Sequence, residues 1–166
     1  LKGGSYLKEA LSKIKSTENL IFSIVTFGTN NSEISFIDNV PQYNLGQLKD
    51  RCSMALFYNA VDVYVNPTLA EAFGNTAAES LACGTPVVGF KVGGLIDIVD
   101  HGLNGYLANE EDVNDLMHGI TGFVDKRNEI EIRENCRDKA VRSFSRVVVL
   151  GKHIDFLKRI TNIHQK

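Results

Sequence analysis

The sequence lacks the features that define several large classes of protein. Its net charge is −2 and no stretch gathers lysine and arginine. We therefore expect no nucleic-acid partner, because phosphate backbones are bound by clustered basic side chains. No apolar run approaches the ~18 to 20 residues that cross a bilayer, and no signal peptide is recognisable. The chain also has no internal repeat and no low-complexity segment.

Cysteine is scarce as well. The three cysteines, Cys52, Cys83 and Cys136, are widely spaced and odd in number, and no C-x-x-C pair occurs. A zinc site is therefore not expected, and no other metal is expected. Unpaired thiols are typical of proteins from a reducing compartment, so we expect a cytoplasmic protein.

The composition that remains, 43% hydrophobic and 23% charged residues, is that of one globular domain. Apolar runs alternate with helical periodicities. We expect strands at 19–28, 33–37, 61–67, 85–90 and 103–108, and helices at 5–15, 45–59, 75–83, 95–99, 110–124, 128–142 and 146–161. Strands that are apolar on both faces favour a parallel sheet covered by helices. This predicts an α/β domain with a doubly wound, Rossmann-like parallel sheet.

The stretch EAFGNTAAESLACGTPVV, residues 71–88, follows the strand that stops at Pro67. Ligands of doubly wound sheets bind at the carboxyl ends of strands, where loops meet helix starts. Asn75 is a suitable N-cap, and Gly84 a suitable C-terminal cap, for a helix of small residues. Backbone N–H groups from Gly74 to Ala77 would then form an anion site fit for phosphate.

Two acids, Glu71 and Glu79, lie on either side of that helix start. Carboxylates accept hydrogen bonds only, so they suit sugar hydroxyls and not phosphate. Glu79 lies about 6 Å beyond the phosphate position, at about 1.5 Å per helical residue, where a ribose diol would sit. Glu71 could take the hydroxyls of a sugar on the far phosphate. The alternative is the solvated rim of an ordinary helix, which the spacing alone does not exclude.

The run NAVDVYVNPTLAEAFGNTAAESLACGTPVVGFKVGGLIDIVDHGLNGYLA, residues 59–108, resembles the signature region of retaining glycosyltransferases of family 4. Its motifs are a strand ending in Pro-Thr, E-x7-E enclosing Phe-Gly, Cys-Gly-Thr-Pro-Val-Val, a Gly-Gly loop and an Asn-Gly turn. A weaker similarity extends back to Lys2. The resemblance implies that residues 1–166 are the donor-binding C-terminal domain of a GT-B fold, which has two Rossmann-like domains.

The resemblance also implies roles for individual residues. Glu79 would bind the ribose hydroxyls, and Glu71, the residue similar to the catalytic position, would contact the donor sugar. Lys2 would neutralise the diphosphate leaving group without a metal. The diphosphate would be held by the backbone at Phe73, Gly74, Asn75 and Thr76. We expect Glu71 to position the substrate and not to act as a nucleophile.

The chain departs from the family pattern at several points. A first strand ending in Gly-Arg, and the N-terminal acceptor domain, would both precede Leu1. That strand is internal in the order 3-2-1-4-5-6, so without it we expect a gap in the sheet. A short polar loop replaces the usual helix after the second strand, and Asp38 stands where glycine is common. We expect these residues alone to have no transferase activity.

The function implied is retaining transfer of a hexosyl group from a UDP- or GDP-sugar to a glycan or lipid-linked acceptor, in polysaccharide assembly. The full-length protein would work at the inner face of the membrane, with no cofactor. Its last helices would cross to the N-terminal domain, so the stripe Leu150, Ile154 and Leu157, if exposed, would favour self-association. The alternatives are a non-catalytic nucleotide-sugar-binding module and a GT-B sugar-nucleotide epimerase.

His101 is expected to be structural. Asn104-Gly105 is expected to supply a turn with positive φ. Gly93-Gly94 either lets the backbone approach the donor or forms an ordinary turn.

Overall fold

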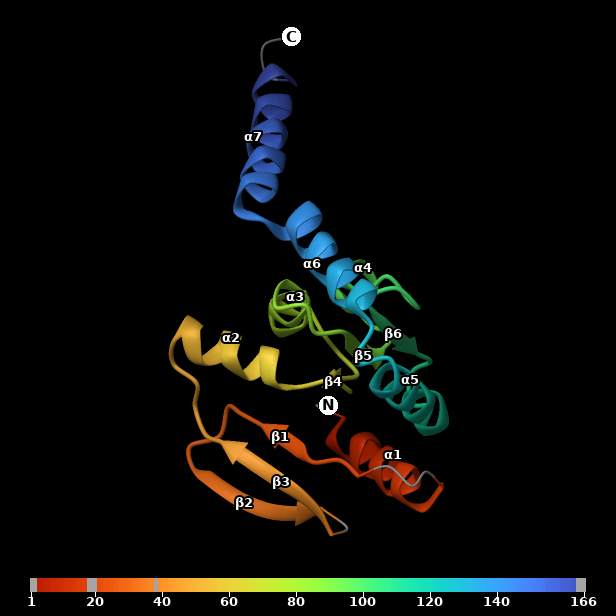
Figure 1. Cartoon of the computed structure of the whole chain (residues 1–166). Helices are drawn as coiled ribbons and strands as arrows, with labels where there is room; N and C mark the ends of the chain where they lie inside the picture. The colour runs from red at the N-terminus through yellow and green to blue at the C-terminus, as the bar shows by residue number, and fades with distance from the viewer. Residues whose placement is uncertain (1–2, 18–20, 38, 164–166) are drawn as a thin grey trace.

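The computed structural model describes residues 3–17, 21–37 and 39–163, and it has an α/β architecture in which strands and helices alternate (Figure 1). Lys2 and Asp38 lie outside the described residues. In chain order the elements are α1 (Gly4–Thr17), β1 (Ile24–Thr26), β2 (Ser32–Ile37), β3 (Val40–Leu45), α2 (Arg51–Ala60), β4 (Tyr64–Asn66), α3 (Asn75–Ala82), β5 (Val87–Phe90), α4 (Leu95–Ile98), β6 (Gly105–Ala108), α5 (Val113–Asp125), α6 (Ile130–Phe144) and α7 (Arg146–Ile163).

The strands of the second half form a parallel sheet in the order β4-β5-β6. Val65 lies opposite Val88, and Val88 lies opposite Tyr106. This sheet confirms the expected α/β class with a parallel sheet. It carries at its carboxyl edge the loop that contains Glu71.

The strands of the first half form a separate, mixed sheet in the order β1-β3-β2. β1 is parallel to β3, but β2 is antiparallel to β3, with Ile34 opposite Tyr43. The expectation of one wholly parallel sheet is therefore wrong here. Only two residues link Ile37 to Val40, and Asn39 has a φ of 63°. So short a link permits a hairpin, whereas parallel strands need a crossover of about a dozen residues or more.

The strand β3, Val40–Leu45, was not predicted, and the helix expected from residue 45 begins only at Arg51. The strand sequence VPQYNL buries Val40 and Asn44 and leaves Tyr43 and Leu45 exposed. Its inward side is therefore partly polar, and the apolar alternation that marks a strand is weak. The start of α2 is fixed by Asp50, whose carboxylate accepts a hydrogen bond from the Ser53 N–H at 2.9 Å.

The strands expected at 19–28 and 61–67 are much shorter than predicted. β1 covers only residues 24–26 and β4 only residues 64–66. Within the described residues, β1 pairs only with β3 and β4 only with β5, so each keeps one edge without a strand partner. Residues at the ends of the two apolar runs have no backbone partner on either side, so they are not part of a sheet. Both strands are therefore shorter than the apolar runs that contain them.

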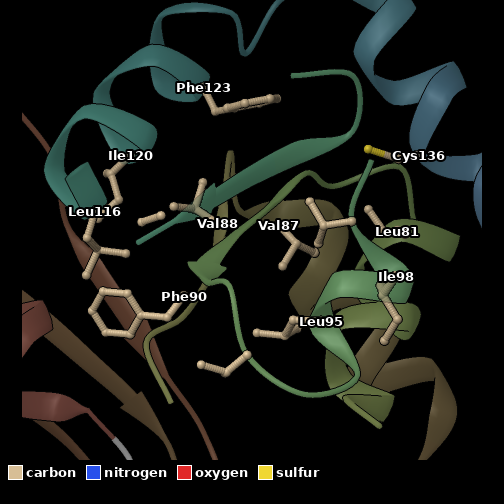
Figure 2. Close-up of a cluster of buried hydrophobic side chains, with 14 of the residues drawn as sticks. Leu81, Val87, Val88, Phe90, Leu95, Ile98, Leu116, Ile120, Phe123 and Cys136 are labelled. Atoms are coloured by element: carbon tan, nitrogen blue, oxygen red, sulfur yellow. The ribbon is translucent and has the colours of Figure 1, made fainter. Parts of the chain in front are cut away.

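The main hydrophobic core surrounds β5, the central strand of the parallel sheet (Figure 2). Val87, Val88 and Phe90 are fully buried, together with Leu95 from α4 and Leu116 from α5. Burying each side chain of this kind contributes about 1.5 to 3 kcal/mol. The sheet edge that carries the Glu71 loop is thus rigidly supported.

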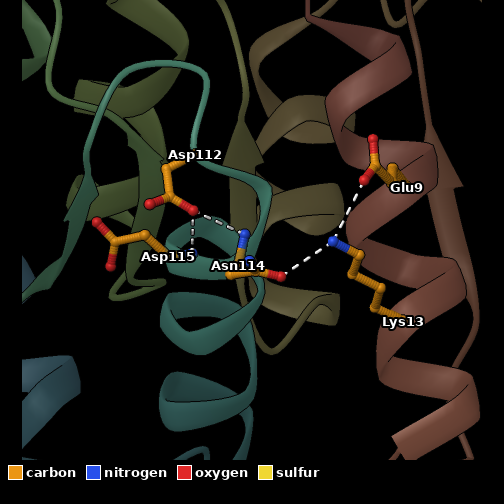
Figure 3. A network of polar contacts seen from close by, with 5 residues as sticks. All are labelled: Glu9, Lys13, Asp112, Asn114 and Asp115. Atoms are coloured by element: carbon orange, nitrogen blue, oxygen red, sulfur yellow. Dashed lines mark hydrogen bonds and ion pairs between the residues drawn. The ribbon is translucent and has the colours of Figure 1, made fainter.

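Polar contacts fix α3 and α5 to their neighbours. The buried Ser80 hydroxyl donates to the Thr85 carbonyl at 3.0 Å, and the Thr85 hydroxyl donates to the Tyr58 carbonyl at 2.6 Å. At α5, the Asp112 carboxylate accepts the N–H groups of Asn114 and Asp115, at 2.9 and 3.0 Å. Figure 3 shows this cap, together with the contact that joins it to α1 through Lys13, whose Nζ donates to Asn114 Oδ1 at 3.0 Å and pairs with Glu9 at 3.2 Å.

The last helix, α7, projects away from the rest of the fold (Figure 1). Its stripe of Leu150, Ile154 and Leu157 is 49%, 51% and 60% exposed. In this structure the stripe is therefore solvent-facing and not a packed face. No helix in the described part of the chain is both long and apolar enough to cross a membrane.

Candidate functional site

The loop that carries Glu71 lies between β4 and α3 and packs against the Gly93-Gly94 turn. The Gly94 N–H donates to the Glu71 carbonyl at 3.2 Å. A Cβ on Gly93, whose φ is 46°, would overlap that carbonyl, and a Cβ on Gly94 would overlap the backbone of Phe73. The two glycines are therefore needed for contact with the chain's own loop, which accounts for them without a ligand.

The start of α3 is built differently from the sequence prediction. The N-cap is Gly74, with φ 95° and ψ 50°, and Asn75 is the first helical residue. The prediction of Asn75 as N-cap is therefore wrong, because the chain turns through a left-handed conformation that glycine adopts without strain. A Cβ at Gly74 would come within 3.1 Å of Ile98 Cδ1. The end of the helix agrees with the prediction, since Gly84 has a φ of 82° and donates to the Leu81 carbonyl at 2.9 Å.

Two backbone donors are available at this helix start. The Gly74 carbonyl accepts the N–H groups of Ala77 and Ala78, at 3.0 and 3.1 Å. The N–H groups of Asn75 and Thr76 have no hydrogen-bond partner among the described residues. Unpaired amides at the positive end of a helix favour an anion such as phosphate.

Glu79 is exposed on α3 and is held by a tyrosine that the sequence analysis did not single out. The Tyr58 hydroxyl donates to Glu79 Oε2 at 3.2 Å. Tyr58 is only 1% exposed, so its ring is fixed by packing, and burial is the main cause that raises the pKa of its hydroxyl above the usual value. The hydroxyl therefore remains a donor throughout the physiological range. The only sequence signal was an aromatic residue with a polar tip on the buried face of α2.

A second tyrosine contacts the start of α3. The Tyr64 hydroxyl, from β4, donates to Thr76 Oγ1 at 2.9 Å. Burial raises the pKa of Tyr64, and the negative charges of Glu71 and Glu79 raise it further. Glu71 itself packs beside the helix start, since a Cβ at Gly74 would lie 3.5 Å from Glu71 Cγ. The fold thus places the Glu71 loop next to the start of the helix that carries Thr76 and Glu79.

The Phe73 side chain packs against Phe144 of α6. Its ring is 43% exposed and meets the Phe144 ring edge-on, at 5.6 Å and 86°. It belongs to an open groove of about 490 Å³ between α3 and the junction of α6 with α7. Asn75 and Glu79 line the same groove, but Glu71 does not. The Phe73 side chain thus shares a groove with Glu79, and the role of its backbone toward a diphosphate stays a prediction.

A larger cavity, of about 550 Å³, lies between β1 and β4 and contains none of the predicted site residues. Its size does not make it the candidate site, because its lining is chiefly aliphatic and carries no cluster of acids or donors. The start of α3 is the better guide to chemistry, since its unpaired N–H groups lie beside Glu71 and on the same helix as Glu79.

The remaining predicted residues have these positions. Lys2 lies outside the described residues, so its role stays a prediction. Gly3 is described, and with a φ of 65° it packs so closely on the Pro67 carbonyl that a Cβ would overlap it. Within the described residues, no group of three or more His, Cys, Asp or Glu side chains could hold a metal ion. Independence of metal remains a prediction.

The turn before β6 is held by its own contacts. His101 Nδ1 accepts the Leu107 N–H at 3.1 Å, which agrees with a structural role. The predicted positive φ at Asn104-Gly105 is wrong, because the positive φ in this turn belongs to Gly102, at 83°. Gly105 is required for a different reason: a Cβ there would overlap the Val87 carbonyl of β5.

Comparison with known proteins gives consistent results. Residues 1–126 match the family described as "Glycosyl transferases group 1". D-inositol 3-phosphate glycosyltransferase 2 of Catenulispora acidiphila is 37% identical over 94 residues, which are 56% of this chain and 22% of that protein. D-inositol 3-phosphate glycosyltransferase of Thermomonospora curvata is 44% identical over 89 residues, 54% of this chain and 20% of that protein. The chain thus spans about a fifth of the length of these relatives.

Solved structures resemble the whole chain. Sucrose-phosphate synthase from Thermosynechococcus elongatus has a TM-score of 0.80 at 23% identity, over 98% of this chain and 43% of that one. Anabaena HepE in complex with UDP has a TM-score of 0.75 at 22% identity, over 95% of this chain and 45% of that one. At such identities the likeness establishes the fold, which is that of one part of GT-B glycosyltransferases. The family match covers more than half of the chain, so the chain belongs to the group 1 glycosyltransferases.

Proposed function

We propose that this chain is the donor-binding part of a glycosyltransferase that moves a hexosyl group from a nucleoside diphosphate sugar to a glycan or lipid-linked acceptor. The observation that carries the proposal is a helix start with two unpaired N–H groups, which has the Glu71 side chain beside Gly74 and carries Glu79 about one turn further on. Carboxylates suit hydroxyls and helix-terminal amides suit phosphate. A nucleoside diphosphate sugar offers sugar hydroxyls at one end, the diphosphate in the middle and ribose hydroxyls beyond it.

Each residue has a distinct role in this proposal. Glu79, held by Tyr58, accepts hydrogen bonds from the ribose diol. The N–H groups of Asn75 and Thr76 hold the diphosphate. Glu71, in the loop before α3, takes hydroxyls of the donor sugar in this proposal. Tyr58 does not touch the ligand in this scheme, so it is a positioning residue.

The reaction breaks the bond from the sugar C1 to the diphosphate oxygen. Negative charge grows on the leaving phosphate while C1 becomes oxocarbenium-like. The positive end of α3 favours that charge most strongly in the transition state, and such preorganised donors contribute directly to rate. Lys2 is proposed to supply a further positive charge. Retention of configuration is proposed from the likeness of the E-x7-E region to retaining enzymes, with Glu71 positioning the sugar.

The nature of the donor is supported by the fold neighbours. The HepE structures are titled as complexes with UDP, with UDP and glucose, and with UDP-glucose. A non-catalytic nucleotide-sugar-binding module would use the same groups for binding. It is the second candidate, because Glu79 and the unpaired N–H groups at the start of α3 can bind a nucleotide whether or not a sugar is transferred.

The experiment is a calorimetric titration of the chain with UDP, GDP and ADP, repeated with Glu79→Ala. The variant should bind the preferred nucleotide roughly 1 to 3 kcal/mol more weakly, because hydrogen bonds to a charged group are lost. Glu33→Ala, on an exposed part of β2, is the matched control and should bind like the parent. Unchanged affinity of Glu79→Ala for all three nucleotides would remove the ribose assignment.

Catalysis is tested separately with a radiolabelled donor. We expect no turnover by residues 1–166 alone and turnover by the full-length protein. A full-length protein that binds the nucleotide but neither transfers nor hydrolyses any sugar would favour the binding module instead.

A further inference from the structure

The chain enters α3 through a residue that has no side chain. Gly74, the N-cap, has a φ of 95° and makes no side-chain capping hydrogen bond. Glycine adopts this left-handed conformation freely, but it can also leave it freely. The Asn75 and Thr76 N–H groups follow directly, so their direction depends on the angle at which the chain enters the helix. A neighbouring side chain is therefore needed to fix that angle.

Phe73 occupies the position from which helices commonly fix their entry angle. An apolar residue just before the N-cap often packs against the fourth helical residue, a contact called a hydrophobic staple. The fourth residue of α3 is Ala78, whose single methyl group offers a phenyl ring little surface. The Phe73 ring meets the Phe144 ring edge-on, at 5.6 Å between centroids and 86°, which is a favourable aromatic geometry. The larger partner of the staple thus comes from another helix, α6.

Phe144 is itself held firmly. It is the last residue of α6 and is partly buried against the main core. Three buried residues of α6 precede it at intervals of four: Ile132, Cys136 and Ala140. Positions four apart share one face of a helix, so Phe144 extends the buried face by one turn. The same end of α6 is tied to the turn before β6, because Lys139 Nζ pairs with Asp100 Oδ1 at 2.6 Å.

The Phe73 ring, by contrast, contributes little to the core. It is 43% exposed, and a ring left partly in water stabilises the fold less than a buried one. It lines the same groove as Asn75 and Glu79, next to the residues that are proposed to bind the nucleotide. The contact between the two rings therefore joins a firmly packed helix end to the loop at the candidate site.

We propose that Phe144 is a positioning residue for the diphosphate of the donor. Through Phe73 it fixes the entry of the chain into α3, and with it the direction of the Asn75 and Thr76 N–H groups. Phe144 touches no ligand in this scheme. The inference rests on the proposed function, because that function assigns the two N–H groups to the diphosphate.

The test is calorimetry with UDP, the nucleotide of the HepE complexes, and with uridine, whose weaker binding is measured by competition with UDP. GDP with guanosine, or ADP with adenosine, replaces this pair if the titrations above show that preference. Phe144→Leu keeps an apolar side chain but removes the ring. It should weaken UDP by about fivefold, the equivalent of one aromatic contact. Uridine should be weakened less than about twofold, because it has no phosphate for the N–H groups.

Two further variants serve as controls. Phe144→Tyr keeps the ring and should bind UDP like the unaltered chain. Phe156→Leu makes the same change on α7, where the ring is 62% exposed, and should leave the binding of both ligands unchanged. Equal weakening of UDP and uridine by Phe144→Leu would show a general structural role and would overturn the proposal.

A double-mutant cycle tests the route through Phe73. Phe73→Leu should weaken UDP by the same factor as Phe144→Leu, and the double variant should be no weaker than either alone. Losses that multiply would overturn the proposal. If Phe144→Leu binds UDP like the unaltered chain, the positioning role alone is wrong, whereas an unaltered chain that binds none of the three nucleotides overturns the proposed function as well. If Phe144→Leu fails to fold, the comparison of UDP with uridine is decided by Phe73→Leu, which alters a half-exposed ring.

Discussion

Replacing Tyr58 by Phe is the sharpest test of how the nucleotide site is organised. The change removes one oxygen and leaves the buried ring in place. The lost contact is the 3.2 Å hydrogen bond to Glu79 Oε2. Its acceptor is exposed, so water can replace the donor when the protein is unliganded. The free energy of unfolding should therefore change by less than about 1 kcal/mol.

The effect on binding should be larger than the effect on stability. Without the tyrosine hydroxyl, the Glu79 carboxylate rotates freely and must be ordered by the ligand itself. Loss of one such hydrogen bond amounts to about 1 kcal/mol, which is roughly a fivefold rise in the Kd for the nucleotide. Tyr64→Phe is the matched control, because it removes a buried hydroxyl that instead contacts Thr76, at the phosphate end.

The assay compares two ligands by calorimetry, the preferred nucleoside diphosphate and its 2′,3′-dideoxy form. Tyr58→Phe should weaken the first and leave the second nearly unchanged, since the dideoxy ligand has no hydroxyls for Glu79. Tyr64→Phe should weaken both by the same factor. If Tyr58→Phe weakened both ligands equally, or lowered the unfolding free energy by several kcal/mol, the hydroxyl would be structural and the positioning role would be wrong.

Three further predictions concern other parts of the fold. Glu71→Gln in the full-length enzyme should lower kcat far more than nucleotide affinity, and equal losses in steady-state kinetics and calorimetry would count against its sugar-side position. Gly94→Ala should unfold at a clearly lower temperature, because its Cβ overlaps the Phe73 backbone, whereas Gly122→Ala, with open space and a helical position, should match or exceed the parent in a thermal melt. Burial opposes ionisation of Asp115, but hydrogen bonds from a backbone N–H and a tyrosine hydroxyl hold its pKa below the usual value. Its contribution to stability is therefore present above about pH 4, the unfolded pKa, and is lost as the pH falls through the folded value. Urea unfolding from pH 6 to 3 should show a shallower decline for Asp115→Asn, and parallel curves would refute this.

The sequence predicted the elements around the signature region well, because they are short apolar runs ended by proline or glycine. The bounds of α3, α4 and β6 differ from expectation by one or two residues. The predictions from sequence failed where a feature depends on a contact between residues that are far apart in the chain. The N-cap at Gly74 depends on a conformation set beside Ile98, and the Glu79 contact depends on Tyr58, which is 21 positions away. Neither contact produces a periodic pattern of residues in the sequence, so neither could be predicted from it.

The two short strands, β1 and β4, show a second limit of local sequence. Both runs have the β-branched and aromatic residues of long buried strands, and both were predicted as such. Their actual length is set by neighbours in the sheet, which propensity does not describe. The apolar residues beyond the paired segments are nevertheless accounted for, since many of them line the cavity of about 550 Å³ between β1 and β4. Their apolar character therefore reflects this shared space and not longer strands.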